Sequence, residues 1–169
     1  MEKILFIWIS EKTLDGFRLD CLKRAKKIYE NVQLILITNL KKGCPEEVDT
    51  ILPIDYYLGL LWKEYGIKTP DIITQTNFTR YYYLSKNPNT LYLDTDIYLQ
   101  RKIEVNDYIG RYGKDISAVF NGNELSFFDN LIRLRNSNNS TENLKSFFPQ
   151  DAIDLSRWMT HKTKTFKKD

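Results

Sequence analysis

Histidine and cysteine are scarce in this chain of 169 residues, which has one histidine and two cysteines. Because the one histidine, His161, lies in a basic C-terminal stretch, no Ser/His/Asp arrangement indicates a serine hydrolase. The sequence has neither a P-loop nor a Gly-rich dinucleotide-binding motif, which sets aside the common kinases and dehydrogenases. Cys21 and Cys44 lack the spacing of metal ligands, and we expect packing or loop residues without a disulfide bond.

The chain also lacks a large excess of charge and any long apolar run. The net charge is +3, and much of it lies between His161 and Lys168, so nucleic acid binding is not indicated. Six apolar residues follow Met1-Glu2-Lys3, too few for the apolar region of a signal peptide and far too few to cross a membrane. We therefore expect a cytoplasmic protein without a transmembrane segment.

The length and the composition fit a single domain. With 42% hydrophobic and 28% charged residues, the chain has enough apolar side chains to fill one core. We assign residues 1–160 to this domain and residues 161–169 to a basic C-terminal tail.

Apolar strands and amphipathic helices alternate along the chain. The runs Ile4–Ile9 and Val32–Thr38 predict buried strands, and the apolar residues between Leu14 and Ile28 recur at helical spacing. A strand, a helix and a strand in this order predict a parallel, right-handed crossover.

The remaining pattern continues this alternation. The further predictions are helices over Asp55–Tyr65 and Pro70–Ser85, a short strand over Ile116–Phe120, a helix within Glu124–Leu134, a loop over 136–143 and a short helix over Ala152–Met159. Pro70 is expected in the first turn of its helix. The order predicts an open α/β sheet, in which ligands bind beyond the carboxyl ends of the strands.

Two aspartates one residue apart, Asp94 and Asp96, lie within the apolar and aromatic stretch Leu91–Leu99. Side chains alternate across a strand, so we expect both carboxylates on one face and Thr95 on the other. Such oxygen ligands suit Mg²⁺ or Mn²⁺ holding a phosphate. Because roughly one Asp-x-Asp is expected by chance in a chain with 13 aspartates, the surroundings decide between a metal site and a solvated strand end.

Four segments carry a family resemblance: Phe6-Ile7-Trp8-Ile9-Ser10, Asn77-Phe78-Thr79-Arg80-Tyr81-Tyr82-Tyr83-Leu84, Tyr92-Leu93-Asp94-Thr95-Asp96 and Pro149-Gln150-Asp151-Ala152-Ile153. Together they resemble the metal-dependent GT-A glycosyltransferases, especially the retaining enzymes related to glycogenin, lipopolysaccharide galactosyltransferases and the clostridial glucosylating toxins. The resemblance implies a GT-A Rossmann-like three-layer α/β/α sandwich. It leaves open a truncation at the C-terminal side, because relatives generally continue well beyond this length.

The chain departs from the family pattern in three places. Asn77 stands where the pattern has Asp, and Asn87-Pro88-Asn89 replaces the Gly-Gly pair that precedes the metal strand in the toxin branch. Pro149 replaces the first acid of an Asp-Gln-Asp segment, which weakens the expected sugar contact there.

The resemblance assigns roles to individual residues. Asp96 is expected to bind the metal directly, with Asp94 shared between the metal and hydroxyls of the ribose or sugar, and His161 is a candidate third ligand. Residues expected to contact the donor are Ile7, Trp8, Ser10, Asn77, Arg80, Tyr92, Asp94 and Lys164. Residues expected at the transferred sugar, and so catalytic, are Asp94, Gln150 and Asp151.

Simpler interpretations of these residues stay open. Trp8 suits the core about as well as a platform for uracil, since large aromatic side chains are mostly buried. Arg80 could pair with a surface acid, and a lone histidine such as His161 is usually a surface residue. The Tyr81–Tyr83 side chains are expected to serve mostly in packing against the rest of the protein.

The predicted function is a metal-dependent hexosyltransferase that uses a UDP-sugar and Mn²⁺ or Mg²⁺, with retention favoured by the resemblance. The acceptor, whether glycan, lipid or protein, and the oligomeric state, a homo-oligomer included, are left open. One alternative is a non-catalytic domain that binds a nucleotide sugar or a partner. A haloacid-dehalogenase-like phosphatase is remote, because its Asp-x-Asp belongs near the N-terminus and Tyr98 stands where Thr or Val is expected.

Overall fold

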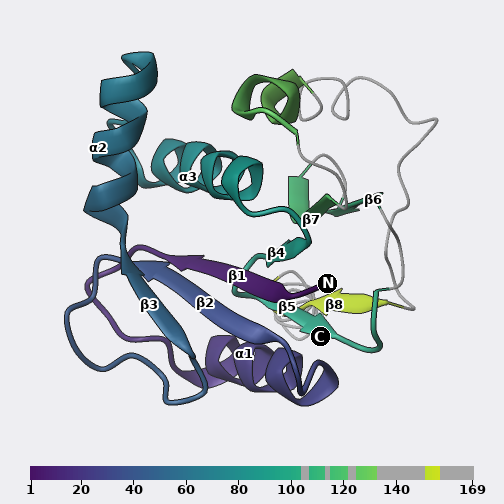
Figure 1. Cartoon of the computed structure of the whole chain (residues 1–169). Helices are drawn as coiled ribbons and strands as arrows, with labels where there is room; N and C mark the ends of the chain where they lie inside the picture. Colours follow the sequence, from purple (N-terminus) through teal and green to yellow (C-terminus); the bar gives the residue numbers. More distant parts are fainter. Residues whose placement is uncertain (104–106, 113–114, 122–124, 133–150, 157–169) are drawn as a thin grey trace, which may run out of the picture.

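The computed structural model describes residues 1–103, 107–112, 115–121, 125–132 and 151–156. At its centre is a six-stranded sheet with the strand order β3-β2-β1-β4-β7-β6 (Figure 1). Four neighbouring strands are parallel: β1 (Lys3–Trp8), β2 (Gln33–Thr38), β3 (Thr50–Pro53) and β4 (Thr90–Leu93). Two antiparallel strands extend this sheet beside β4: β6 (Asp107–Tyr112) and β7 (Asp115–Asn121). The predicted strands at Ile4–Ile9, Val32–Thr38 and Ile116–Phe120 are confirmed.

Helices cover both faces of the sheet (Figure 1). On one face lies α1 (Gly16–Ile28), and on the other lie α2 (Ile54–Tyr65), α3 (Ile72–Lys86) and the helical residues 127–132. These three layers confirm the predicted α/β/α sandwich. None of the helices in the described ranges is long and apolar enough to cross a membrane.

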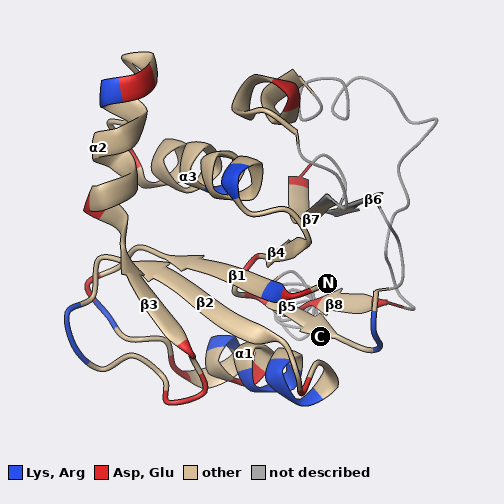
Figure 2. Cartoon of the chain, in the orientation of Figure 1, with Lys and Arg blue, Asp and Glu red and all other residues tan. Residues whose placement is uncertain are grey.

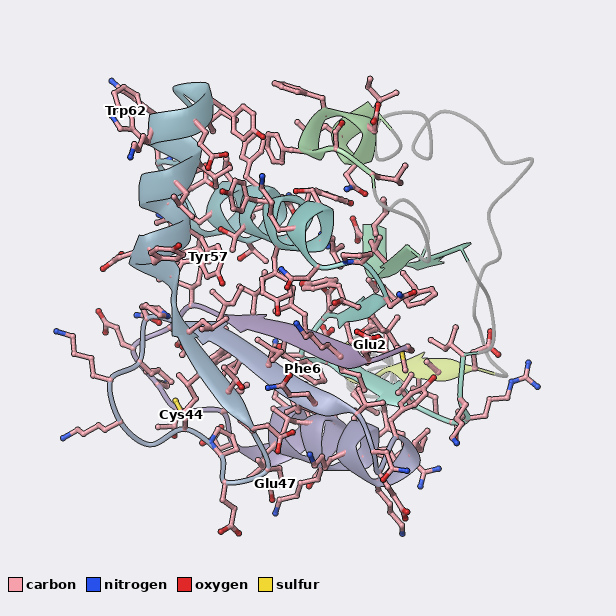
Figure 3. The ribbon with its side chains drawn as sticks, in the orientation of Figure 1. Glu2, Phe6, Cys44, Glu47, Tyr57 and Trp62 are labelled. Carbon is pink, nitrogen blue, oxygen red and sulfur yellow. The ribbon has the colours of Figure 1, made fainter. Side chains whose placement is uncertain are left out.

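The core divides into two halves according to the alternation of side chains along the strands. Ile4 and Phe6 belong to the cluster on the α1 side, whereas Leu5 and Ile7 pack with α2 and α3; Figure 3 shows Phe6 and Tyr57 on these opposite sides. Because both faces are covered, these strands are apolar at consecutive positions. The tyrosines at 81, 82 and 83 are all buried in the second cluster, as expected for a packing run.

A second, two-stranded sheet lies on the α1 side. It pairs β5 (Ile97–Leu99) with β8 (Ala152–Asp154) in antiparallel register, and Ile97, Leu99 and Ala152 join the core cluster there. The predicted helix over Ala152–Met159 is therefore wrong at its start, where the segment is a strand that pairs with a distant part of the chain. Of the described residues in this segment, 151–156, only 155 and 156 are helical.

The boundaries of several elements also differ from prediction. The strand that leads to the aspartate pair ends at Leu93, so residues 94–96 form a turn between β4 and β5. Helix α3 begins at Ile72, and Asp71 is its N-cap, accepting a hydrogen bond of 2.8 Å from the Thr74 amide. Pro70 thus precedes the helix and is not in its first turn.

Besides β8, two further strands, β3 and β6, were not predicted. Of the helix expected within Glu124–Leu134, residues 127–132 are helical and 125–126 are not. The loop expected over 136–143 lies outside the described residues.

Candidate functional site

A pocket of about 230 Å³ opens at the carboxyl ends of the parallel strands β1 and β4. From β1 the chain proceeds to β2 and β3 on one side, and it returns to form β4 on the other side. Open α/β sheets bind ligands at such a switch in strand order. The pocket is lined by Ile7, Trp8, Ile9, Arg18, Ile72, Thr76, Tyr92, Asp94, Thr95 and Asp96.

The turn that carries both aspartates is fixed by backbone hydrogen bonds from three directions. The Asp94 amide donates to the Ser117 carbonyl of β7 at 2.8 Å, and the Ile97 amide donates to the Asp94 carbonyl at 3.2 Å. The Leu155 amide, just after β8, donates to the Asp96 carbonyl at 2.9 Å. The first bond joins the turn to the six-stranded sheet, the third joins it to the segment after β8, and the second closes the turn on itself.

Both carboxylates line the pocket, although not for the predicted reason. Since residues 94–96 are a turn, strand alternation does not apply to them, and Thr95 lines the pocket as well. The Thr95 hydroxyl accepts a hydrogen bond of 2.6 Å from Nη1 of Arg18. Lining the same pocket does not fix the direction of the Thr95 side chain, so its predicted orientation away from the two acids stays a prediction.

Asp94 is held from behind by an aromatic and cationic group. The Tyr92 hydroxyl donates to Oδ1 of Asp94 at 2.7 Å, and Nη1 of Arg80 lies 4.0 Å from the same oxygen. The Arg80 guanidinium is 4.8 Å from the ring centroids of both Tyr81 and Tyr92. Its Nη2 donates to Oδ1 of Asn77 at 3.1 Å, which aligns the arginine.

These surroundings raise the pKa of Asp94 to about 6. Burial is the largest cause, and the neighbouring carboxylates of Asp96 and Asp154 add to it. The Arg80 charge and the Tyr92 hydrogen bond act in the opposite direction, because they favour the ionised form. The Asp94 side chain keeps 35% of its surface exposed and lines the pocket, so a ligand there can reach it.

Asp96 offers an unpaired oxygen. Its Oδ1 is buried and has no hydrogen-bond partner within the described ranges. A buried carboxylate oxygen without a partner is costly unless a cation satisfies it. Mn²⁺ and Mg²⁺ prefer oxygen ligands, so the pair formed with Asp94 fits a divalent ion.

The two aspartates would not complete the coordination of such an ion alone. Across the described part of the chain, no group of three or more His, Cys, Asp or Glu side chains is arranged to hold a metal. Mg²⁺ commonly keeps water and takes substrate phosphates alongside one or two carboxylates. The arrangement thus suits an ion that arrives with a phosphate ligand.

The other predicted donor contacts fall into two groups. Ile7, Trp8 and Tyr92 line the pocket, and the Trp8 indole N–H donates to the Lys12 carbonyl at 2.8 Å. Ser10 and Asn77 are not among the lining residues. The Ser10 amide donates to the side chain of Asn39, and Arg80, which is 4% exposed, also lies behind the pocket wall.

The predicted catalytic residue Asp151 lies away from the pocket. It precedes β8 at the end that pairs with Leu99, and its Oδ1 accepts a hydrogen bond of 2.7 Å from Nε of Arg101. The opposite end of β8 brings Asp154 near the turn, where it affects the pKa of Asp94. Gln150, His161 and Lys164 lie outside the described residues, so their roles stay predictions.

Five lining residues were not predicted from the sequence: Ile9, Arg18, Ile72, Thr76 and Thr95. Arg18 lies in the first turn of α1, the helix that follows β1, whose carboxyl end forms part of the pocket. That position is a usable signal, because the helix after a parallel strand begins at the ligand-binding edge.

This chain is similar to known proteins in its structure but not detectably in its sequence. No family model and no curated protein matches the sequence. A solved transferase with two Cys-to-Ser substitutions superposes with a TM-score of 0.52 at 14% identity, covering 90% of this chain and 93% of that one. The PaToxG glycosyltransferase superposes with a TM-score of 0.50 at 12% identity, covering 85% of this chain and 62% of that one. The chain therefore has the Rossmann-like α/β fold found in these transferases.

Proposed function

We propose that this chain is a metal-dependent glycosyltransferase of the hexosyltransferase type, which transfers a sugar from a UDP-sugar to a hydroxyl acceptor. The observation that carries the proposal is the unpaired, buried Oδ1 of Asp96 beside Asp94, in a pocket at the switch in strand order. A fold shared with transferases, one of them a glycosyltransferase, supports it.

Departure of a nucleoside diphosphate is the step that such a pocket has to assist. A bound Mn²⁺ or Mg²⁺ supplies positive charge that stabilises the leaving diphosphate. Asp94 and Asp96 would hold this ion. Tyr92 and Arg80 hold Asp94 in place, and Trp8 offers an aromatic surface on which a base can stack.

Several finer features belong to the proposal through the family resemblance. They are retention at the transferred sugar, a third metal ligand at His161, a phosphate contact at Lys164 and a sugar contact at Gln150. The proposed acceptor is a hydroxyl group of a glycan, lipid or protein.

A second candidate, a nucleotide-sugar-binding domain without turnover, is favoured by the position of Asp151. Its carboxylate is engaged by Arg101 outside the pocket, so it does not supply an acid to the transferred sugar there. Slow hydrolysis of UDP-sugars with Mn²⁺ separates the candidates, because an enzyme releases free sugar whereas a binding domain does not.

The proposal is tested by the thermal stability of the protein with UDP, in the presence and absence of Mn²⁺. A ligand at 100 times its dissociation constant stabilises the native state by about 2.7 kcal/mol. For a chain of this length we expect the melting temperature to rise by roughly 5–10 °C. The rise should need both UDP and Mn²⁺ together.

Two variants complete this test. Asp96→Asn should remove the UDP-dependent rise, and Asp55→Asn, at the exposed start of α2, should keep it. No rise in the wild-type protein, or an equal rise with Asp96→Asn, would contradict the proposal.

A further inference from the structure

The described lining of the pocket contains few positively charged side chains. Both acids of the turn line it, and Arg18 is the only lysine or arginine among the lining residues that the structure describes. Arg80 is buried behind Asp94, and its Nη1 and Nη2 donate to the Ile116 carbonyl and to Asn77. A divalent ion would offset the two carboxylates, which leaves the charge of an incoming diphosphate to be met by something else.

Arg18 lies in the pocket beside the turn, where the diphosphate of the donor would bind next to the metal. Its Nη1 bonds to Thr95, the residue between the two acids, so the guanidinium lies beside the proposed metal ligands. The guanidinium carbon is 5.1 Å from the ring centroids of both Trp8 and Phe17. Contact with aromatic faces restricts the guanidinium without using its N–H donors.

Most of the hydrogen-bonding capacity of Arg18 is unused within the described residues. A guanidinium has five N–H donors, and the one hydrogen bond that Arg18 makes there goes to Thr95. Such a planar group matches phosphate oxygens two at a time. Helix α1 is rich in basic residues (Figure 2), yet Arg18 alone among them lines the pocket.

We infer that Arg18 is the diphosphate-binding residue of this site and determines its selectivity for a nucleoside diphosphate over a nucleoside. This inference rests on the proposed function, since it names the group that recognises the phosphates of that donor. It assigns the two arginines different tasks: Arg80 supports a carboxylate of the protein, and Arg18 binds the ligand.

The test compares UDP with uridine by calorimetry, in excess Mn²⁺, for wild-type protein and Arg18→Gln. Uridine has the base and ribose but no phosphate, so it reports on the Trp8 side of the pocket alone. Loss of a charge-assisted contact should weaken UDP binding about 10- to 100-fold. Uridine binding should change less than about 3-fold.

Matched controls separate binding from folding. Lys23→Gln removes the same charge from an exposed position on α1 and should leave both affinities unchanged. Arg18→Lys keeps the charge but loses the paired donors, so we expect an intermediate loss for UDP. This variant also serves if Arg18→Gln does not fold.

The possible outcomes are distinct. Equal UDP affinity in wild-type protein and both Arg18 variants overturns the inference. A parallel loss for UDP and uridine also overturns it, and would indicate a structural role for Arg18. Absence of UDP binding to the wild-type protein with Mn²⁺ would instead overturn the proposed function itself.

Discussion

Two arginines approach the Asp94–Asp96 turn from opposite faces of the sheet. Arg80 comes from α3, is 4% exposed and lies against Asp94, whereas the half-buried Arg18 comes from α1 and lines the pocket. The charge of Arg80 is used within the protein, and that of Arg18 is directed to the space where a ligand would bind. Burial, and not residue type, therefore separates a group that holds a site together from one that meets its ligand.

The largest expected effect is that of removing the buried arginine. Arg80→Met should lower the free energy of unfolding by about 3 kcal/mol, because it leaves the Asp94 carboxylate without its cation. Arg18→Gln should cost less than about 1 kcal/mol, since a half-buried group loses one hydrogen bond. Urea unfolding of both variants measures the difference. Equal losses would remove the distinction between the two arginines.

The next effect is the dependence of Mn²⁺ binding on pH. The pKa of Asp94 is raised to about 6 in the folded protein, so the native state binds this proton more tightly than the unfolded chain does. The neutral carboxyl thus favours the metal-free fold at low pH, and this contribution is lost as the pH rises through 6. Mn²⁺ needs the ionised form.

We therefore expect Mn²⁺ affinity in the presence of UDP to fall about tenfold for each pH unit below 6. Titrations between pH 4.5 and 7.5 measure this change. Asp94→Asn should bind weakly at every pH, without the same slope. A wild-type affinity that is flat across this range would exclude Asp94 as a ligand.

A smaller effect is expected from the hydroxyl of Tyr92. Tyr92→Phe keeps the buried ring and loses the 2.7 Å hydrogen bond to Asp94, so the free energy of unfolding should fall by about 1 kcal/mol. Because that bond favours the ionised carboxylate, its loss should move the pH midpoint of Mn²⁺ binding upward. A downward shift would show that the hydrogen bond does not support Asp94 as described.

The smallest effect is expected at Asp151, whose partner Arg101 is largely exposed. Exposed ion pairs contribute about 0–1 kcal/mol, so Asp151→Asn should change stability little. Hydrolysis of a UDP-sugar should also stay within about 2-fold of the wild-type rate, because Asp151 does not line the pocket. A large loss of hydrolysis at unchanged stability would restore the catalytic role that the sequence suggests.

Much of the fold follows from local patterns in the sequence. The strands β1 and β2 are apolar at every central position because helices cover both faces, and such runs are easy to recognise. By contrast, β8 has three residues and exists through its pairing with β5, more than fifty residues earlier in the chain. A local sequence pattern does not reveal that partner. Taken alone, the segment after Ala152 therefore indicates a short helix.

The site divides in the same way. Asp94, Asp96, Tyr92 and Trp8 lie at the ends of apolar strands, where an α/β order predicts a ligand. Arg18 lies in a helix with several lysines and arginines, and the apolar periodicity that defines α1 does not say which basic residue reaches the pocket. What distinguishes Arg18 from the other basic residues is its place in the first turn of α1, at the ligand-binding edge of the sheet.

The central claim is that the Asp94–Asp96 turn binds one divalent ion together with the diphosphate of a nucleotide. Electron paramagnetic resonance of free Mn²⁺ during titration of the protein with UDP measures this most directly. The account predicts one bound Mn²⁺ per chain, retained only with UDP, and its loss in Asp96→Asn but not in Asp55→Asn. Equal Mn²⁺ uptake by wild-type protein and Asp96→Asn would contradict it.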